Sequence, residues 1–138
     1  SYTESLKNYS EKLDISDQLT WCGFINDQQK KHFFDNIDFF VLPSKHENFG
    51  IAVIEALAHG RPVIISDQVD TAHWVDAYEC GMIISPEVEA VNESLEKAFH
   101  MADKRYEEMS VSAVKLVEKE FSNERIKDLL KVLYGLKN

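Results

Sequence analysis

Two glutamates, Glu47 and Glu55, frame the point at which a loop is expected to enter a helix. Glu47 falls in the loop, and Glu55 falls just over one turn inside the helix, on the same side as Ile51. This spacing directs Glu55 toward the protein, where a carboxylate needs a hydrogen-bond partner. Because a carboxylate can accept from two adjacent hydroxyls, the pair suits a polyhydroxylated ligand. The alternative is a solvated loop residue and a helix-surface charge.

The elements that position these glutamates are predicted to be strand, loop, helix and strand. The apolar run Phe39 to Leu42 is typical of a buried parallel strand, and Pro43 ends it because proline cannot donate a ladder hydrogen bond. Apolar residues then recur at helical spacing, at Ile51, Ile54, Leu57 and Ala58. Gly60 ends this helix. A right-handed crossover would place the helix N-terminus at the carboxyl edge of the sheet, where Gly50 lets backbone approach an anion.

Length and composition limit the class of protein. The 138 residues, 44% of them hydrophobic, are enough for one domain that spans 1–138. The formal net charge of −9 argues against nucleic acid or an anionic membrane surface as a partner. Cys22 and Cys80 lack zinc-ligand spacing, and we expect both to be reduced, buried thiols. With no signal peptide and no bilayer-spanning apolar run, the sequence predicts a cytoplasmic protein.

The rest of the chain continues the alternation of helices and strands. Further strands are predicted at Thr20 to Phe24, Pro62 to Ile65 and Met82 to Ser85. One helix is predicted at 2–13, and a second begins at a capping box formed by Asn26 and Gln29. A third is predicted at 71–78 with Asp70 as its N-cap, and a fourth begins at Pro86. Two more are predicted at 106–121 and 123–136. The fold class is therefore α/β, a three-layer Rossmann-like parallel sheet of four strands flanked by helices.

A run of specified positions carries a resemblance to a known family. These are Pro43-Ser44, Glu47, Phe49-Gly50, Glu55-Ala56, Gly60 and Pro62-Val63. Their order and spacing resemble the C-terminal, nucleotide-sugar-binding domain of GT-B fold retaining glycosyltransferases of the group 1, or family 4, type. A looser resemblance extends from about residue 19 to the C-terminus. It implies transfer of a sugar from a nucleotide diphosphate sugar to a hydroxyl acceptor, with retention at the anomeric carbon.

The resemblance also implies roles for individual residues. The first glutamate holds hydroxyls of the donor sugar, amides beside the Phe-Gly pair face the sugar and diphosphate, and the second glutamate holds the ribose hydroxyls. By position, these roles fall to Glu47, to Asn48, Phe49, Gly50 and Ile51, and to Glu55. Gly23, Phe24 and Ile25 are candidate backbone contacts to the base, a plain strand end being the alternative. Glu47, the candidate catalytic residue, would position substrate rather than act as nucleophile or base.

One position departs clearly from the family. Val69-Asp70 stands where the family usually has paired glycines, which stiffens a loop expected near the donor phosphates. Two rivals therefore remain: a same-fold glycan synthase or phosphorylase, and a binding or assembly module that has lost its chemistry. No cofactor is expected because the nucleotide sugar is a substrate. No metal is expected either, since Asp67 and Asp70 have no third ligand nearby.

The resemblance sets expectations about a larger enzyme. A complete domain of this kind begins with a strand near Gly-Arg and a following Lys that neutralise the diphosphate, and neither precedes Ser1. We expect the C-terminal part of a larger enzyme, inactive alone, with a glycan, lipid-linked or small-molecule acceptor bound elsewhere. That enzyme would be cytoplasmic or peripheral at the inner face of a membrane. The edge at 39–42 should be covered by strand 20–24, or by a second copy in a homodimer, in which the last helix can also take part.

Donor binding by residues 1–138 alone is predicted to be weak. Each absent charge-assisted contact is worth roughly 1.5 to 3 kcal/mol, so the affinity should be millimolar or undetectable. Isothermal titration calorimetry with uridine and guanosine diphosphate sugars measures this. Micromolar binding would contradict the prediction.

Overall fold

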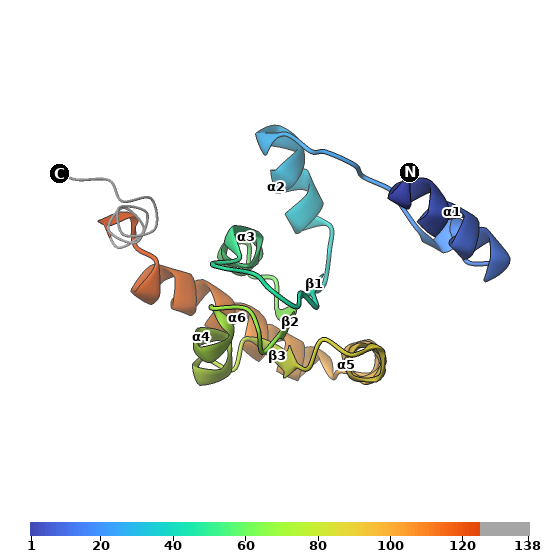
Figure 1. Cartoon of the computed structure of the whole chain (residues 1–138). Helices are drawn as coiled ribbons and strands as arrows, with labels where there is room; N and C mark the ends of the chain where they lie inside the picture. The colour runs from blue at the N-terminus through green and yellow to red at the C-terminus, as the bar shows by residue number, and fades with distance from the viewer. Residues whose placement is uncertain (125–138) are drawn as a thin grey trace. The chain divides into compact units, whose positions relative to one another are not determined.

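The computed structural model describes residues 1–124, so that the predicted helix 123–136 lies almost entirely outside the described residues. The chain forms two compact units, 1–31 and 32 onward (Figure 1). Within the described part, no helix has the length and apolar character needed to cross a membrane.

The first unit consists of helices and an irregular segment. It contains α1 (Tyr2–Lys12), the 3₁₀ helix η1 (Ser16–Gln18) and the first residues of α2 (Asp27–Asp35). The predicted capping box at α2 is confirmed, because the Asn26 N–H donates to Gln29 Oε1 at 2.9 Å and the Gln29 N–H donates to Asn26 Oδ1 at 3.0 Å. These two bonds fix where α2 begins.

The predicted strand from Thr20 to Phe24 is wrong. Residues 20–24 are irregular and pair with no strand among residues 1–124, and Gly23 interrupts them in the left-handed region at φ +61°. A short segment with β-forming residues becomes a strand only where another strand accepts its backbone hydrogen bonds. Cys22, in this segment, is exposed rather than buried, which corrects the prediction for that thiol.

The second unit is built on a parallel sheet flanked by helices. Its three strands, β1 (Phe40–Leu42), β2 (Val63–Ser66) and β3 (Gly81–Ile84), lie in the order β1-β2-β3 (Figure 1). The prediction of a four-stranded sheet is therefore wrong, because the first predicted strand, 20–24, is not part of the sheet. Strand β1 lies at an edge of the described sheet. The helices are α3 (Ile51–Ala58), α4 (Ala72–Ala77), α5 (Val88–Phe99) and α6 (Asp103–Glu120).

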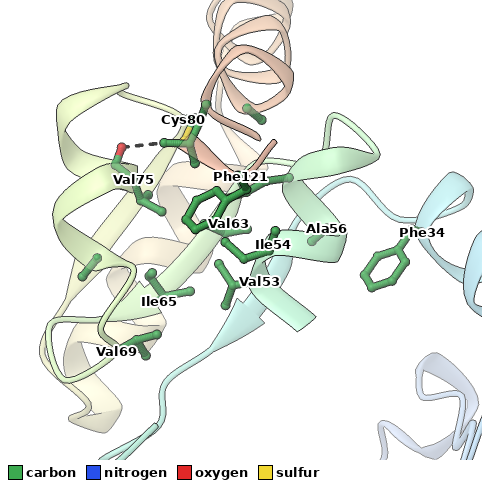
Figure 2. Packing of buried hydrophobic residues seen from close by; sticks show 14 residues of the cluster. Phe34, Val53, Ile54, Ala56, Val63, Ile65, Val69, Val75, Cys80 and Phe121 are labelled. Carbon is green, nitrogen blue, oxygen red and sulfur yellow. Dashed lines mark hydrogen bonds between the residues drawn. The ribbon is translucent and has the colours of Figure 1, made fainter. Parts of the chain in front are cut away.

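One face of the sheet and the helices packed on it form the core. Val63 and Ile65 of β2 are fully buried against α3, α4 and α6, in the cluster that Figure 2 shows. Cys80 lies in this cluster, and its thiol donates to the Val75 carbonyl oxygen at 3.8 Å. Burial raises the pKa of Cys80 to about 11, so the thiol is protonated at neutral pH.

The opposite side of β3 faces α5. Met82, Ile83 and Ile84 line a cavity of about 430 Å³ together with Ser94 and other residues of α5, and Ile83 also packs against the core. With helices packed on both sides of β3, the layered α/β architecture predicted from the sequence is present, in a sheet of three strands.

Side chains from two segments, the residue Arg61 before β2 and helix α6, hold the amino edge of the sheet. The Arg61 guanidinium donates to the Asp35 carbonyl oxygen at 3.1 Å and to the Tyr106 hydroxyl at 3.4 Å. Ser110 Oγ donates to the Gly60 carbonyl oxygen at 2.6 Å, and Gly60 has the φ of +67° expected of a residue that ends a helix. These contacts fix the amino end of β2 and leave its carboxyl end for the site.

Gly81→Ala is predicted to destabilise the second unit strongly. A Cβ at this position would collide with the Val63 carbonyl oxygen and would lie 2.7 Å from Val75 Cγ1. We expect the free energy of unfolding to fall by about 3 kcal/mol, measured by urea denaturation. The control is Gly23→Ala, whose Cβ meets no heavy atom within 4 Å and costs only its left-handed backbone, about 1 kcal/mol. Equal losses in the two variants would contradict the steric argument.

Candidate functional site

The candidate site lies at the carboxyl edge of the sheet. The loop 43–50 leaves the carboxyl end of β1, and the segment 67–71 leaves the carboxyl end of the neighbouring β2. The two segments meet, because Glu47 and Val69 form an isolated parallel bridge. Ligands of open parallel sheets bind at this edge, since consecutive loops converge there.

Glu47 is available to a ligand. Its side chain is half-buried, and its carboxylate has no hydrogen-bond or ion-pair partner among residues 1–124. A half-buried carboxylate without a protein partner is suited to accept hydrogen bonds from outside the chain. The two residues that follow Glu47 differ in exposure. Asn48 is exposed, whereas Phe49 packs edge-on against Phe121, with ring centroids 5.7 Å apart.

Helix α3 begins immediately after this loop, at the predicted residue. Gly50 is its N-cap, buried and in the left-handed region at φ +66°, and no side chain caps the helix. The Val53 N–H donates to the Gly50 carbonyl oxygen at 2.8 Å, while Ile51 and Ala52 are the first two helical residues. Early helical N–H groups lack intrahelical acceptors, so this end of α3 has the geometry that suits an anion.

Glu55 lies on the side of α3 rather than on its core face. The buried residues of the helix are Val53, Ile54, Ala56 and Leu57. Glu55 is half-buried, and Ile51, which was expected to share a protein-facing side with it, is 54% exposed. The prediction that Ile51 shares a protein-facing side with Glu55 was therefore wrong, because α3 is apolar along most of its length and apolar spacing alone could not identify the face that packs on α6 and the sheet.

The candidate contacts to a nucleotide base belong to the first unit. Phe24 is 96% exposed, Gly23 has a left-handed backbone, and Ile25 is half-buried. Their role beside a base stays a prediction.

Sequence reasoning missed Ser66, which connects the two segments of the site. Ser66 Oγ donates to the Ser44 carbonyl oxygen, and it accepts from the Gln68 N–H at 3.2 Å. Both partners are main-chain groups, so the sequence offered only a weak signal, a hydroxyl that ends the apolar run Val63–Ile65.

The segment after Ser66 does not form the predicted helix cap. Helix α4 begins at Ala72 with Thr71 as its N-cap, and Asp70 only accepts, through its carbonyl oxygen, from His73 Nδ1 at 2.8 Å. The Asp67 carboxylate accepts from Gln68 Nε2 at 2.9 Å. Within residues 1–124, no group of three or more His, Cys, Asp or Glu side chains is arranged to hold a metal ion.

A family match covers most of the chain. The family described as "Glycosyl transferases group 1" matches residues 1–115. An "Uncharacterized glycosyltransferase" of Haemophilus influenzae is 30% identical over 106 residues, which cover 77% of this chain and 25% of that protein. "Mannosylfructose-phosphate synthase" of Agrobacterium fabrum is 33% identical over 61 residues, which cover 44% of this chain and 13% of that protein. The chain therefore spans a quarter or less of the length of these relatives.

A solved structure has the same fold. The chain superposes on sucrose-phosphate synthase from Thermosynechococcus elongatus with a TM-score of 0.80 at 24% sequence identity. The superposition covers 95% of this chain and 33% of the solved one.

Thr71→Val is predicted to stabilise the protein. Thr71 is fully buried, and its Oγ1 has no hydrogen-bond partner among the described residues. Valine has nearly the same shape and removes the unpaired hydroxyl, so the free energy of unfolding should rise by about 1 kcal/mol, measured by chemical denaturation. Thr20→Val, at an exposed position, is the control and should change little. A loss of stability in Thr71→Val alone would contradict the prediction and indicate that the hydroxyl has a partner.

Proposed function

Because the chain belongs to the group 1 glycosyltransferase family, we propose that it forms the donor-binding part of an enzyme that transfers a sugar from a nucleotide diphosphate sugar to a hydroxyl acceptor. One observation carries the proposal: Glu47, whose carboxylate has no partner among residues 1–124, lies four residues before the start of α3, which no side chain caps, at the carboxyl edge of the sheet. A carboxylate and a set of helix amides match the two chemical parts of such a donor, its hydroxyls and its diphosphate.

Glu47 is assigned to the donor sugar. Its carboxylate can accept hydrogen bonds from two neighbouring sugar hydroxyls and so fix the ring relative to the diphosphate. The negative charge also favours the positive charge that develops at the anomeric carbon as the leaving group departs. In the proposed reaction, the acceptor hydroxyl attacks the anomeric carbon from the face on which the diphosphate leaves. The bond from carbon to the diphosphate oxygen breaks, the hydroxyl proton passes to the departing diphosphate, and the configuration is retained. Glu47 then positions and stabilises, and it forms no bond to carbon.

The start of α3 is assigned to the diphosphate. The chain has a formal net charge of −9, so an anionic ligand has to be held by local donors rather than by the overall field. The amides at Gly50 and Ile51 and the partial positive charge of the helix end supply such donors. Asn48 and Phe49 lead into this turn, and their main-chain amides are assigned to the same ligand. The proposal includes no metal ion and no cofactor.

Glu55 is assigned to the ribose of the nucleotide. It lies one turn along α3 from Ile51, and its side chain is half-buried. A carboxylate there can accept from both ribose hydroxyls.

The similar proteins support a sugar as the group transferred. One relative is named a mannosylfructose-phosphate synthase, and the solved neighbour is a sucrose-phosphate synthase. For this protein we propose a glycan, lipid-linked or small-molecule acceptor. We propose a cytoplasmic enzyme, with peripheral contact to the inner face of a membrane where the acceptor is lipid-linked.

Assays of the full-length protein with radiolabelled sugar nucleotides test the proposal. With the preferred donor, Glu47→Ala should mainly lower turnover, whereas Glu55→Ala should mainly weaken nucleotide binding, each by roughly ten- to a hundredfold. Glu118→Ala, at an exposed position of α6, is the matched control and should keep wild-type kinetics. Wild-type kinetics in both site variants would contradict the assignment and indicate that the two glutamates are surface residues without a role in donor binding. A lack of turnover with every donor would favour the binding or assembly module.

A further inference from the structure

The loop that carries Glu47 has little structure of its own. Between β1 and α3, residues 43–50 contain bends and the single bridge residue Glu47, and no helix or strand. A catalytic carboxylate on such a loop needs support from neighbouring elements to stay within about 0.5 Å of its working position. The segment 66–69, which follows β2, supplies that support at three points.

The first point is Ser66, the last residue of β2. Its side chain is fully buried, and its hydroxyl uses both of its hydrogen-bonding functions on the main chain. It donates to the carbonyl oxygen of Ser44, at the start of the Glu47 loop, and accepts from the Gln68 N–H at 3.2 Å. A buried hydroxyl at the end of an apolar strand thus links the two loops through their backbones.

Val69 supplies the second and third points, which are its bridge with Glu47 and its contact with Gly50. The Val69 N–H donates to the Ser66 carbonyl oxygen at 3.2 Å, which closes a turn over residues 66–69. Val69 forms the parallel bridge with Glu47 itself, and its 2% exposed side chain packs beneath Gly50. A Cβ built on Gly50 would lie 3.2 Å from Val69 Cγ1, so the turn and the start of α3 are in close contact.

We propose that Ser66 is a positioning residue for sugar transfer, which acts through the Ser44 carbonyl and the 66–69 turn to hold Glu47. The inference rests on the proposed function of Glu47. Ser66 is fully buried and does not touch the ligand itself. Without its hydroxyl, the Glu47 loop loses one of its three attachments, while Glu55 keeps its place inside α3. Turnover should therefore suffer and nucleotide binding should not.

Ser66→Ala tests this split in the full-length protein. We expect kcat to fall about tenfold or more, and the inhibition constant of the nucleoside diphosphate to stay within about threefold of wild type. Ser66→Thr keeps the hydroxyl and should recover most of the turnover. Ser94→Ala is the matched control, because Ser94 is 3% exposed and its Oγ also donates to a main-chain carbonyl, that of Val91, on α5. Equal losses in Ser66→Ala and Ser94→Ala, or loss of nucleotide binding in step with turnover, would overturn the proposal.

Amide hydrogen exchange gives a second readout that needs no activity. In Ser66→Ala, the amides of residues 44–50 should exchange about tenfold faster, whereas those of residues 63–65 in β2 should be unchanged. Ser94→Ala should leave both sets unchanged. If exchange at 44–50 responds but the wild-type protein transfers no sugar, the proposed function fails and Ser66 still holds Glu47. If exchange at 44–50 does not respond, the positioning role fails whatever the enzyme does.

Discussion

The parallel pairing of β1 with β2 is the interaction on which the candidate site depends. Its register places Leu42 beside Ile65, so that both strands reach the carboxyl edge of the sheet together. The chain then leaves β1 at Pro43 and leaves β2 after Ser66, and these two exits are close enough for a side chain of one to bond the backbone of the other. A slip of the register by two residues would keep the buried faces buried and would separate Ser66 from Ser44.

The pairing also explains why polar contacts to the buried Ser66 hydroxyl form at this edge. A fully buried carbonyl or hydroxyl has to be satisfied inside the protein, and the sheet ladder satisfies such groups only along the strands. At the last residue of β2, the fully buried Ser66 hydroxyl is satisfied by the Ser44 carbonyl oxygen and the Gln68 N–H. The same requirement that stabilises the fold therefore shapes the loop that carries Glu47. The hydrogen bonds of the Ser66 hydroxyl therefore serve both the fold and the site. A substitution that alters stability at Ser66 also alters the loop that carries Glu47.

The sequence predicted those features that local chemistry determines. Three apolar runs became β1, β2 and β3 within a residue or two, Gly60 ended α3, and Asn26 with Gln29 formed their capping box. Features that depend on distant partners were not predictable in the same way. The segment 20–24 has strand-forming residues and no strand to pair with, and the core face of α3 was hidden because nearly the whole helix is apolar. The support from Ser66 and Val69 arises only when two loops meet, and no spacing in the sequence encodes that meeting.

The contrast between the two cysteines has a practical consequence. Cys22 is exposed, whereas Cys80 is buried and has a pKa of about 11. At pH 8 only about one Cys80 thiol in a thousand is ionised, and that thiol is shielded from solvent. A maleimide dye should therefore attach to native protein at Cys22 without any cysteine being removed. The unmodified chain thus offers one ready attachment point in its first unit for fluorescence or spin-label studies of how that unit responds to ligands.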